Sequence, residues 1–211
     1  MIKQQIAHHI EKVGIIPVVR ASSPELAMNA ARAVCAGGIP IIELTMTVPG
    51  AIEVIRELKR SLDESVLIGA GTVLDAKIAA QCLKAGAQFL VSPGFDRATV
   101  RFARREAIPI LAGALTPTEV IAAWNAGADF VKIFPCGNVG GPSYIRALKA
   151  ALPQIPMVPT GGVNKATAAE FLQAGACAIG VGGELVSGSP QAITEAARQY
   201  VAIIQAARQV G

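Results

Sequence analysis

Lys132 stands in the middle of an apolar run, residues 130–135 (FVKIFP), whose β-branched and aromatic residues predict a strand. Side chains alternate between the two faces of a strand, so Phe130, Lys132 and Phe134 share one face. Burial between two aromatic rings disfavours the charged ammonium and favours a free amine. Such an amine can attack a carbonyl carbon and form a Schiff base. The alternative is an ordinary lysine whose stem packs while its ammonium reaches water.

Glu43 and Arg20 are the other charged residues that the pattern turns inward. In the predicted strand 39–47, Glu43, Thr45 and Thr47 share one face, and the apolar residues between them suit the opposite, helix-covered face. Arg20 closes the predicted strand 14–20 on the face of its inward apolar residues. An interior carboxylate must be paired or protonated. Three unlike charges therefore favour a polar substrate over the alternative, a buried ion network that only closes the core.

Two glycine-rich turns, residues 159–163 (PTGGV) and 180–183 (GVGG), follow predicted strands. Such turns expose backbone N–H groups before a helix and commonly bind phosphate. Tight turns need glycine for conformational reasons as well. Glu184 follows the second turn directly, and a carboxylate pointing into it would repel a phosphate.

A repeated strand–helix unit follows a leading helix at residues 1–12. The predicted strands are 14–20, 39–47, 66–73, 88–93, 108–115, 129–135, 157–163 and 178–185. The predicted helices between and after them are 24–37, 49–61, 75–85, 96–106, 117–126, 142–151, 165–174 and 190–208. Three of these helices end in Ala-Gly-Ala, where the glycine supplies a left-handed cap.

The repeat predicts an α/β fold, a (β/α)8 TIM barrel with an N-terminal capping helix, as one domain over residues 1–211. A doubly wound open sheet is the alternative, but no G-x-G-x-x-G follows a predicted strand. In a barrel, the carboxyl ends of the strands carry the chemistry. Arg20, Glu43, Lys132 and both glycine turns would then meet at one end.

Composition narrows the class of protein. The 211 residues are 52% hydrophobic and 16% charged, with a net charge of +4 that is too weak and dispersed for a nucleic-acid partner. No run of 18 apolar residues suggests a membrane span. The four cysteines and the His8-His9 pair lack metal-ligand spacing. Without a recognisable signal peptide, we expect a cytoplasmic protein with reduced thiols.

Six segments, each at a predicted strand end, resemble one family: IPVVR, IELTMTVPGA, GAGTVL, FLVSPGFD, DFVKIFP and PTGGVN. The chain resembles the class I KDPG/KHG aldolases, which act on 2-keto-3-deoxy-6-phosphogluconate and 4-hydroxy-2-oxoglutarate, from residue 14 to about residue 183. The resemblance implies a Schiff-base lysine at Lys132 and a general acid/base at Glu43. It also implies no metal, no cofactor and a homotrimer.

The resemblance further implies a set of substrate contacts. These are Arg20, Thr72, Pro93, the wall residue Phe134, and, around the rest of the substrate, Thr47, Thr160, Gly161, Gly162, Gly182 and Gly183. Two positions depart from some relatives, which carry arginine in place of Thr47 and serine in place of Glu184. These departures weaken the case for a phosphorylated substrate and leave room for a smaller, unphosphorylated one.

The implied reaction is reversible cleavage of 2-dehydro-3-deoxy-6-phosphogluconate, 4-hydroxy-2-oxoglutarate or both. Pyruvate would be one product, and glyceraldehyde 3-phosphate or glyoxylate the other. A phosphate-binding barrel isomerase or synthase without an imine is the main alternative, because it would use the same glycine turns. A third possibility is a barrel that binds a ligand without catalysis.

Overall fold

The structure, a computed structural model, describes residues 1–209. Its strands are β1 Ile15–Val19, β2 Ile41–Thr45, β3 Leu67–Gly71, β4 Phe89–Val91, β5 Ile110–Ala114, β6 Phe130–Ile133, β7 Met157–Pro159 and β8 Ile179–Val181. Its helices are α1 Lys3–Val13, α2 Pro24–Ala36, α3 Ala51–Ser61, α4 Ala76–Ala85, α5 Arg97–Arg105, α6 Pro117–Ala126, α7 Pro142–Ala151, α8 Ala168–Gln173, α9 Gly183–Val186 and α10 Pro190–Gln209, with a 3₁₀ turn, η1 Cys136–Val139.

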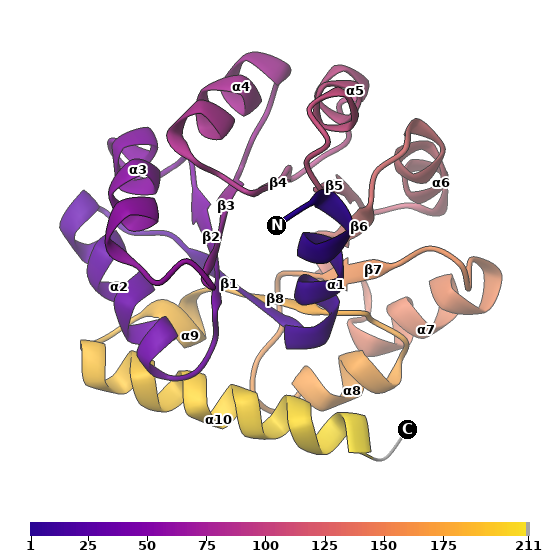
Figure 1. The fold of residues 1–211 in the computed structure, drawn as a ribbon. Helices are drawn as coiled ribbons and strands as arrows, with labels where there is room; N and C mark the ends of the chain where they lie inside the picture. The colour runs from indigo at the N-terminus through magenta and orange to yellow at the C-terminus, as the bar shows by residue number, and fades with distance from the viewer. Residues whose placement is uncertain (210–211) are drawn as a thin grey trace.

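The strands form a barrel with a ring of helices outside it (Figure 1). Consecutive strands pair in parallel from β1 to β7, and β8 pairs with β1. A parallel bridge between Thr160 and Gly180 joins the ends of β7 and β8 and nearly closes the barrel. The predicted (β/α)8 barrel is therefore confirmed.

The barrel has an inner and an outer apolar layer. Phe89 and Phe130 lie in the inner layer, while Val131 and Ile133 pack outward against the helices. Alternation along the strand therefore puts Lys132 on the inner face with Phe130, as predicted. Ile6 and Ile10 of α1 join the inner layer, so α1 closes one end of the barrel (Figure 1). The predicted capping helix is confirmed.

Local sequence signals explain where the helices begin and end. Side chains at the N-caps of α2, α4, α5 and α6 accept a backbone N–H, and Thr116 and Glu119 form the predicted capping box of α6. Gly86, Gly127 and Gly175, in the Ala-Gly-Ala segments, have φ angles of 109°, 96° and 100°. These are left-handed conformations that favour glycine, so the predicted caps are confirmed.

Several predicted strands are shorter than expected because pairing with the neighbouring strand stops first. The predicted strand 178–185 is wrong beyond Val181: the N–H groups of Leu185 and Val186 donate to Gly182 O at 2.9 and 3.3 Å and form α9 instead. The predicted strand 39–47 ends at Thr45, which leaves Thr47 in a turn. The 3₁₀ turn η1 is a further element that the sequence analysis did not predict. None of the helices within residues 1–209 has both the length and the apolar character needed to cross a membrane.

Candidate active site

A cavity of about 430 Å³ opens at the carboxyl ends of the strands. All predicted site residues except Glu43 and Thr47 line it: Arg20, Thr72, Pro93, Lys132, Phe134, Thr160, Gly161, Gly162, Gly182 and Gly183. They come from six different strand ends, which are far apart in sequence. The barrel therefore brings them together at the end where such folds place their chemistry.

Lys132 and Glu43 form a buried charged pair beneath this cavity. Lys132 Nζ lies 3.5 Å from Glu43 Oε1, and the two residues are only 6% and 2% exposed. Within residues 1–209, Glu43 Oε1 accepts no hydrogen bond. Its interaction with Lys132 is an ion pair. Lys132 Nζ also lies 5.5 Å from the centre of the Phe134 ring. The amine is thus held between a carboxylate and an aromatic face, and it reaches the cavity from there.

The end of β2 is fixed by a short chain of hydroxyl groups. Thr45 Oγ1 donates to Val19 O at 3.1 Å and lies 2.8 Å from Thr47 Oγ1. Thr47 is exposed and lies outside the cavity lining. Its contact with Thr45 places it at the rim, where it supports the end of β2.

Thr72 and Pro93 are held on the wall by their backbones. Thr72 has φ of 57°, which is uncommon for a residue other than glycine, and such conformations cluster at functional sites. Next to Pro93, Ser92 Oγ donates to Gly94 O at 2.7 Å and accepts from Gly113 N at 3.3 Å. These bonds fix the loop after β4, so Pro93 faces the cavity from a rigid support.

The first glycine turn is held by η1. Gly137 N donates to Gly161 O at 2.8 Å. A β-carbon on Gly162 would lie 2.7 Å from Gly137 Cα, and Gly161 and Gly162 have φ of 82° and 80°. Glycine is required here by both the close approach and the left-handed backbone.

Other cavity residues were not among the predicted contacts. Val18, Val163, Gly180 and Glu184 also line the cavity. The alternation that turns Arg20 inward applies equally to Val18 and was the available signal for it. The charge of Glu184 is evident from the sequence, but its partner is not. Lys165 N donates to Glu184 Oε1 at 3.4 Å.

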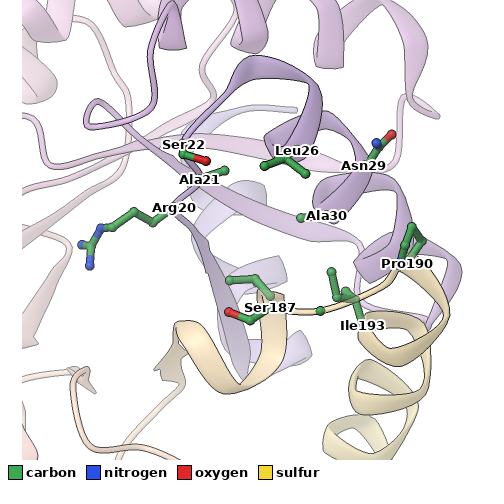
Figure 2. Close-up of a pocket in the computed structure, with 11 residues that line it drawn as sticks. Arg20, Ala21, Ser22, Leu26, Asn29, Ala30, Ser187, Pro190 and Ile193 are labelled. Carbon is green, nitrogen blue, oxygen red and sulfur yellow. The ribbon is translucent and has the colours of Figure 1, made fainter.

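Arg20 lines both this cavity and a second one of about 320 Å³. The second cavity is also lined by Ser22, Leu26, Asn29 and Ser187. Figure 2 shows the Arg20 side chain extending away from the other residues of the second cavity. Arg20 is exposed and, within residues 1–209, makes no side-chain hydrogen bond or ion pair. Its guanidinium is available to a ligand at the border of the two cavities.

Within residues 1–209, no group of three or more His, Cys, Asp or Glu side chains is arranged to hold a metal ion.

Comparison with known proteins agrees with this arrangement. Residues 6–202 match the family model for KDPG and KHG aldolase. A 2-dehydro-3-deoxy-phosphogluconate aldolase of Treponema pallidum is 38% identical over 163 residues, covering 77% of each chain. A 2-dehydro-3-deoxy-6-phosphogalactonate aldolase of Escherichia coli is 32% identical over 199 residues, covering 94% of this chain and 96% of the relative.

A solved structure extends the likeness to three dimensions. The KDPG aldolase of Legionella pneumophila, with pyruvate captured as a covalent carbinolamine intermediate, superposes with a TM-score of 0.81 at 28% identity. The match covers 95% of this chain and 97% of that one. The chain therefore belongs to the KDPG and KHG aldolase family and is an aldolase, a lyase.

Proposed function

We propose that the protein is a class I aldolase in which Lys132 forms a Schiff base with a 2-keto acid and Glu43 transfers protons. The observation that carries this proposal is the 3.5 Å approach of Lys132 Nζ to Glu43 Oε1 beneath the cavity. A buried amine with a carboxylate beside it has both the nucleophile and the proton acceptor that the reaction needs. The carbinolamine captured in the Legionella pneumophila relative supports the same chemistry.

The reaction begins with attack of the neutral Lys132 amine on the C2 keto carbon of the substrate. The carbinolamine loses water to give an iminium, which accepts electrons from the bond that breaks. Glu43, directly or through a water, takes the proton of the C4 hydroxyl. The C3–C4 bond then breaks, and the electron pair moves into an enamine while the aldehyde leaves.

The second half of the reaction returns the enzyme to its starting state. The enamine carbon takes a proton, which Glu43 supplies, and the iminium forms again. Water adds to it, and hydrolysis frees pyruvate and the Lys132 amine. One carboxylate serves both transfers because its protonation state alternates between them.

The remaining cavity residues have roles that follow from their positions. We assign the carboxylate of the keto acid to the wall formed by Thr72 and Pro93, and the flat imine region to the face of Phe134. Arg20 contacts the substrate from the border of the cavity, and Thr47 acts indirectly through Thr45. The distal half of the substrate would then extend toward Thr160 and the two glycine turns.

Two substrates have the reacting half that this mechanism requires. 2-Dehydro-3-deoxy-6-phosphogluconate would give pyruvate and glyceraldehyde 3-phosphate, and 4-hydroxy-2-oxoglutarate would give pyruvate and glyoxylate. They share the 2-keto and 4-hydroxy groups that Lys132 and Glu43 act on, and they differ only in the distal half.

We also propose that the chain acts as a single domain, in the cytoplasm, as a homotrimer. Four free cysteines within the described residues suit a reducing compartment. Light scattering during size-exclusion chromatography tests the oligomeric state directly, and a monomer mass would contradict the trimer.

Borohydride reduction in the presence of pyruvate tests the imine. We expect the wild type to acquire a reduced pyruvate adduct that peptide mass spectrometry assigns to Lys132, and Lys132→Ala to acquire none. Lys165→Ala is the matched control, because Lys165 lies near the same cavity without lining it, and this variant should still be trapped. Trapping that persists in Lys132→Ala would refute the role of Lys132. Absence of trapping in the wild type would point to an isomerase or synthase without an imine.

A further inference from the structure

Glu184 is an acidic residue in the wall of the active-site cavity that the proposed reaction does not use. It lies in α9, directly after Gly182 and Gly183, and lines the same cavity as Gly161 and Gly162. Its side chain is 38% exposed, so the carboxylate is accessible to a ligand in the cavity. The surface around the glycine turns therefore carries a carboxylate as well as backbone N–H groups.

The Glu184 carboxylate is directed toward the loop that follows the first glycine turn. Its Oε1 accepts a hydrogen bond from Lys165 N at 3.4 Å and lies 4.0 Å from Lys165 Nζ. The backbone N–H of such a loop, between a strand and the next helix, is the kind of donor that an anionic ligand uses. The protein's own carboxylate already takes this donor, so a ligand phosphate would compete with it.

Among the described residues, neither cation that lines the cavity forms an ion pair with Glu184. The cations that line the cavity are Lys132, which faces Glu43, and Arg20, at its border. Tyr200 of α10 lies behind α9, and burial together with the negative charge of Glu184 raises the pKa of its phenol. The Tyr200 phenol therefore keeps its proton and adds no negative charge of its own. Lys165, whose Nζ lies 4.0 Å from Glu184 Oε1, does not line the cavity, and it offsets part of the charge of Glu184.

We propose that Glu184 selects substrates whose distal half carries hydroxyl groups instead of a phosphate or a carboxylate. The preferred class would be unphosphorylated 2-keto-3-deoxy sugar acids, which give pyruvate and an uncharged hydroxyaldehyde. A carboxylate accepts hydrogen bonds from such hydroxyls. It repels an anion at the same position. This inference rests on the proposed aldolase function and deepens its substrate class. It keeps the reacting half that the two substrates above share and replaces their anionic distal half by an uncharged, hydroxylated one.

A matched pair of substrates tests the proposal: 2-keto-3-deoxygluconate and its 6-phosphate, compared by kcat/KM for pyruvate release. We expect the wild type to prefer the unphosphorylated substrate by about tenfold or more. Glu184→Gln keeps the shape and removes the charge, so it should shift the ratio toward the phosphate by about tenfold, which corresponds to about 1.4 kcal/mol. Glu195→Gln, which removes an exposed carboxylate of α10 outside this cavity, is the control and should leave the ratio unchanged.

A Lys165 variant provides a second test, in which the ratio of kcat/KM values should change in the direction opposite to that of Glu184→Gln. Because Lys165 offsets the charge of Glu184, Lys165→Met should increase the preference for the unphosphorylated substrate. In the Glu184→Gln background, the same change should have little effect on the ratio, since the charge that Lys165 offsets is gone. An equally large effect in both backgrounds would mean that Lys165 binds phosphate directly, and it would contradict the proposal.

A failure of the Glu184 inference can be distinguished from a failure of the aldolase proposal. Pyruvate lacks the distal half, so its trapping by borohydride depends on Lys132 and is independent of Glu184. If trapping succeeds while the wild type prefers the 6-phosphate, or while Glu184→Gln leaves the ratio within about twofold, the inference about Glu184 is wrong and the aldolase proposal stands. If trapping fails, the aldolase proposal itself falls.

Discussion

The carboxylate of Glu43 rests against the backbone of Gly71. A β-carbon at Gly71 would lie 2.6 Å from Glu43 Cγ and 2.7 Å from Glu43 Cδ, closer than side-chain atoms can approach. The two residues belong to neighbouring strands, β2 and β3, which pair in parallel along their full length. The glycine thus leaves the space in which the carboxylate reaches Lys132.

Gly71→Ala should therefore displace Glu43 without changing any charged group. We expect kcat to fall about tenfold to a hundredfold, because a displacement of about 1 Å at a catalytic group has an effect of this size. Steady-state kinetics of pyruvate release measures it. Gly94→Ala is the control, since a β-carbon there meets no atom within 4 Å, and that variant should keep its activity. Equal kcat in both variants would show that the position of Glu43 is not critical.

Glu43→Gln should separate imine formation from bond cleavage. We expect kcat/KM for the cleavage reaction to fall about 10²–10⁴-fold, the usual contribution of a positioned acid or base. Borohydride should still trap pyruvate on Lys132, because the amine remains in place. A variant that cleaves substrate at the wild-type rate would exclude Glu43 as the proton-transfer group.

The ion pair should also matter for stability. Lys132→Met leaves the Glu43 carboxylate, which is 2% exposed, without its cation. Removing one partner of a buried pair commonly costs about 3–5 kcal/mol, and we expect a loss of this size because Glu43 does not line the cavity. Urea denaturation measures the free energy of unfolding. Adding Glu43→Gln should recover part of the loss, whereas an additive second loss would mean that the two residues do not interact.

The buried thiols predict a loss of stability in alkaline solution. Burial raises the pKa of Cys82 from 9.0 to about 11, and that of Cys136 likewise to about 11. Above pH 9 the unfolded chain loses thiol protons that the folded chain keeps, so the free energy of unfolding falls as pH rises toward 11.

Denaturation curves at pH 8, 9 and 10 measure this dependence, with Cys82→Ala as a comparison whose slope should be smaller. In the native protein, Cys82 and Cys136 should also react slowly with a thiol reagent at pH 8, and unfolding should make their reaction fast. Equal rates before and after unfolding would contradict the burial of these thiols.

The fold was predictable because its signals are local and repeated. Alternating strand and helix patterns, caps such as Thr116 with Glu119, and glycines at helix ends are each defined within a few residues. The shared face of Phe130 and Lys132 follows from the pleat of a strand alone. These features do not depend on which strands become neighbours.

The sequence-based predictions were wrong or incomplete where contacts with distant segments determine the local structure. Strand 178–185 was predicted too long because its end depends on pairing with β1, which stops at Val181. The turn η1 forms where Gly137 contacts Gly161, and no local sequence pattern predicts that contact. Thr47 shares a face with Glu43 in an ideal strand, but β2 ends at Thr45, so Thr47 lies at the rim.

The sequence by itself determined the barrel class, the inward faces of the strands that carry Arg20, Glu43 and Lys132, and the identity of the candidate nucleophile, Lys132. Only the tertiary structure decided that Glu43 lies 3.5 Å from Lys132 and that Glu184 lies beside Lys165. Periodicity assigns a side chain to a face of its own element. Distances between elements depend on barrel closure and on the small residues, such as Gly71, that let side chains from different strands share the same space.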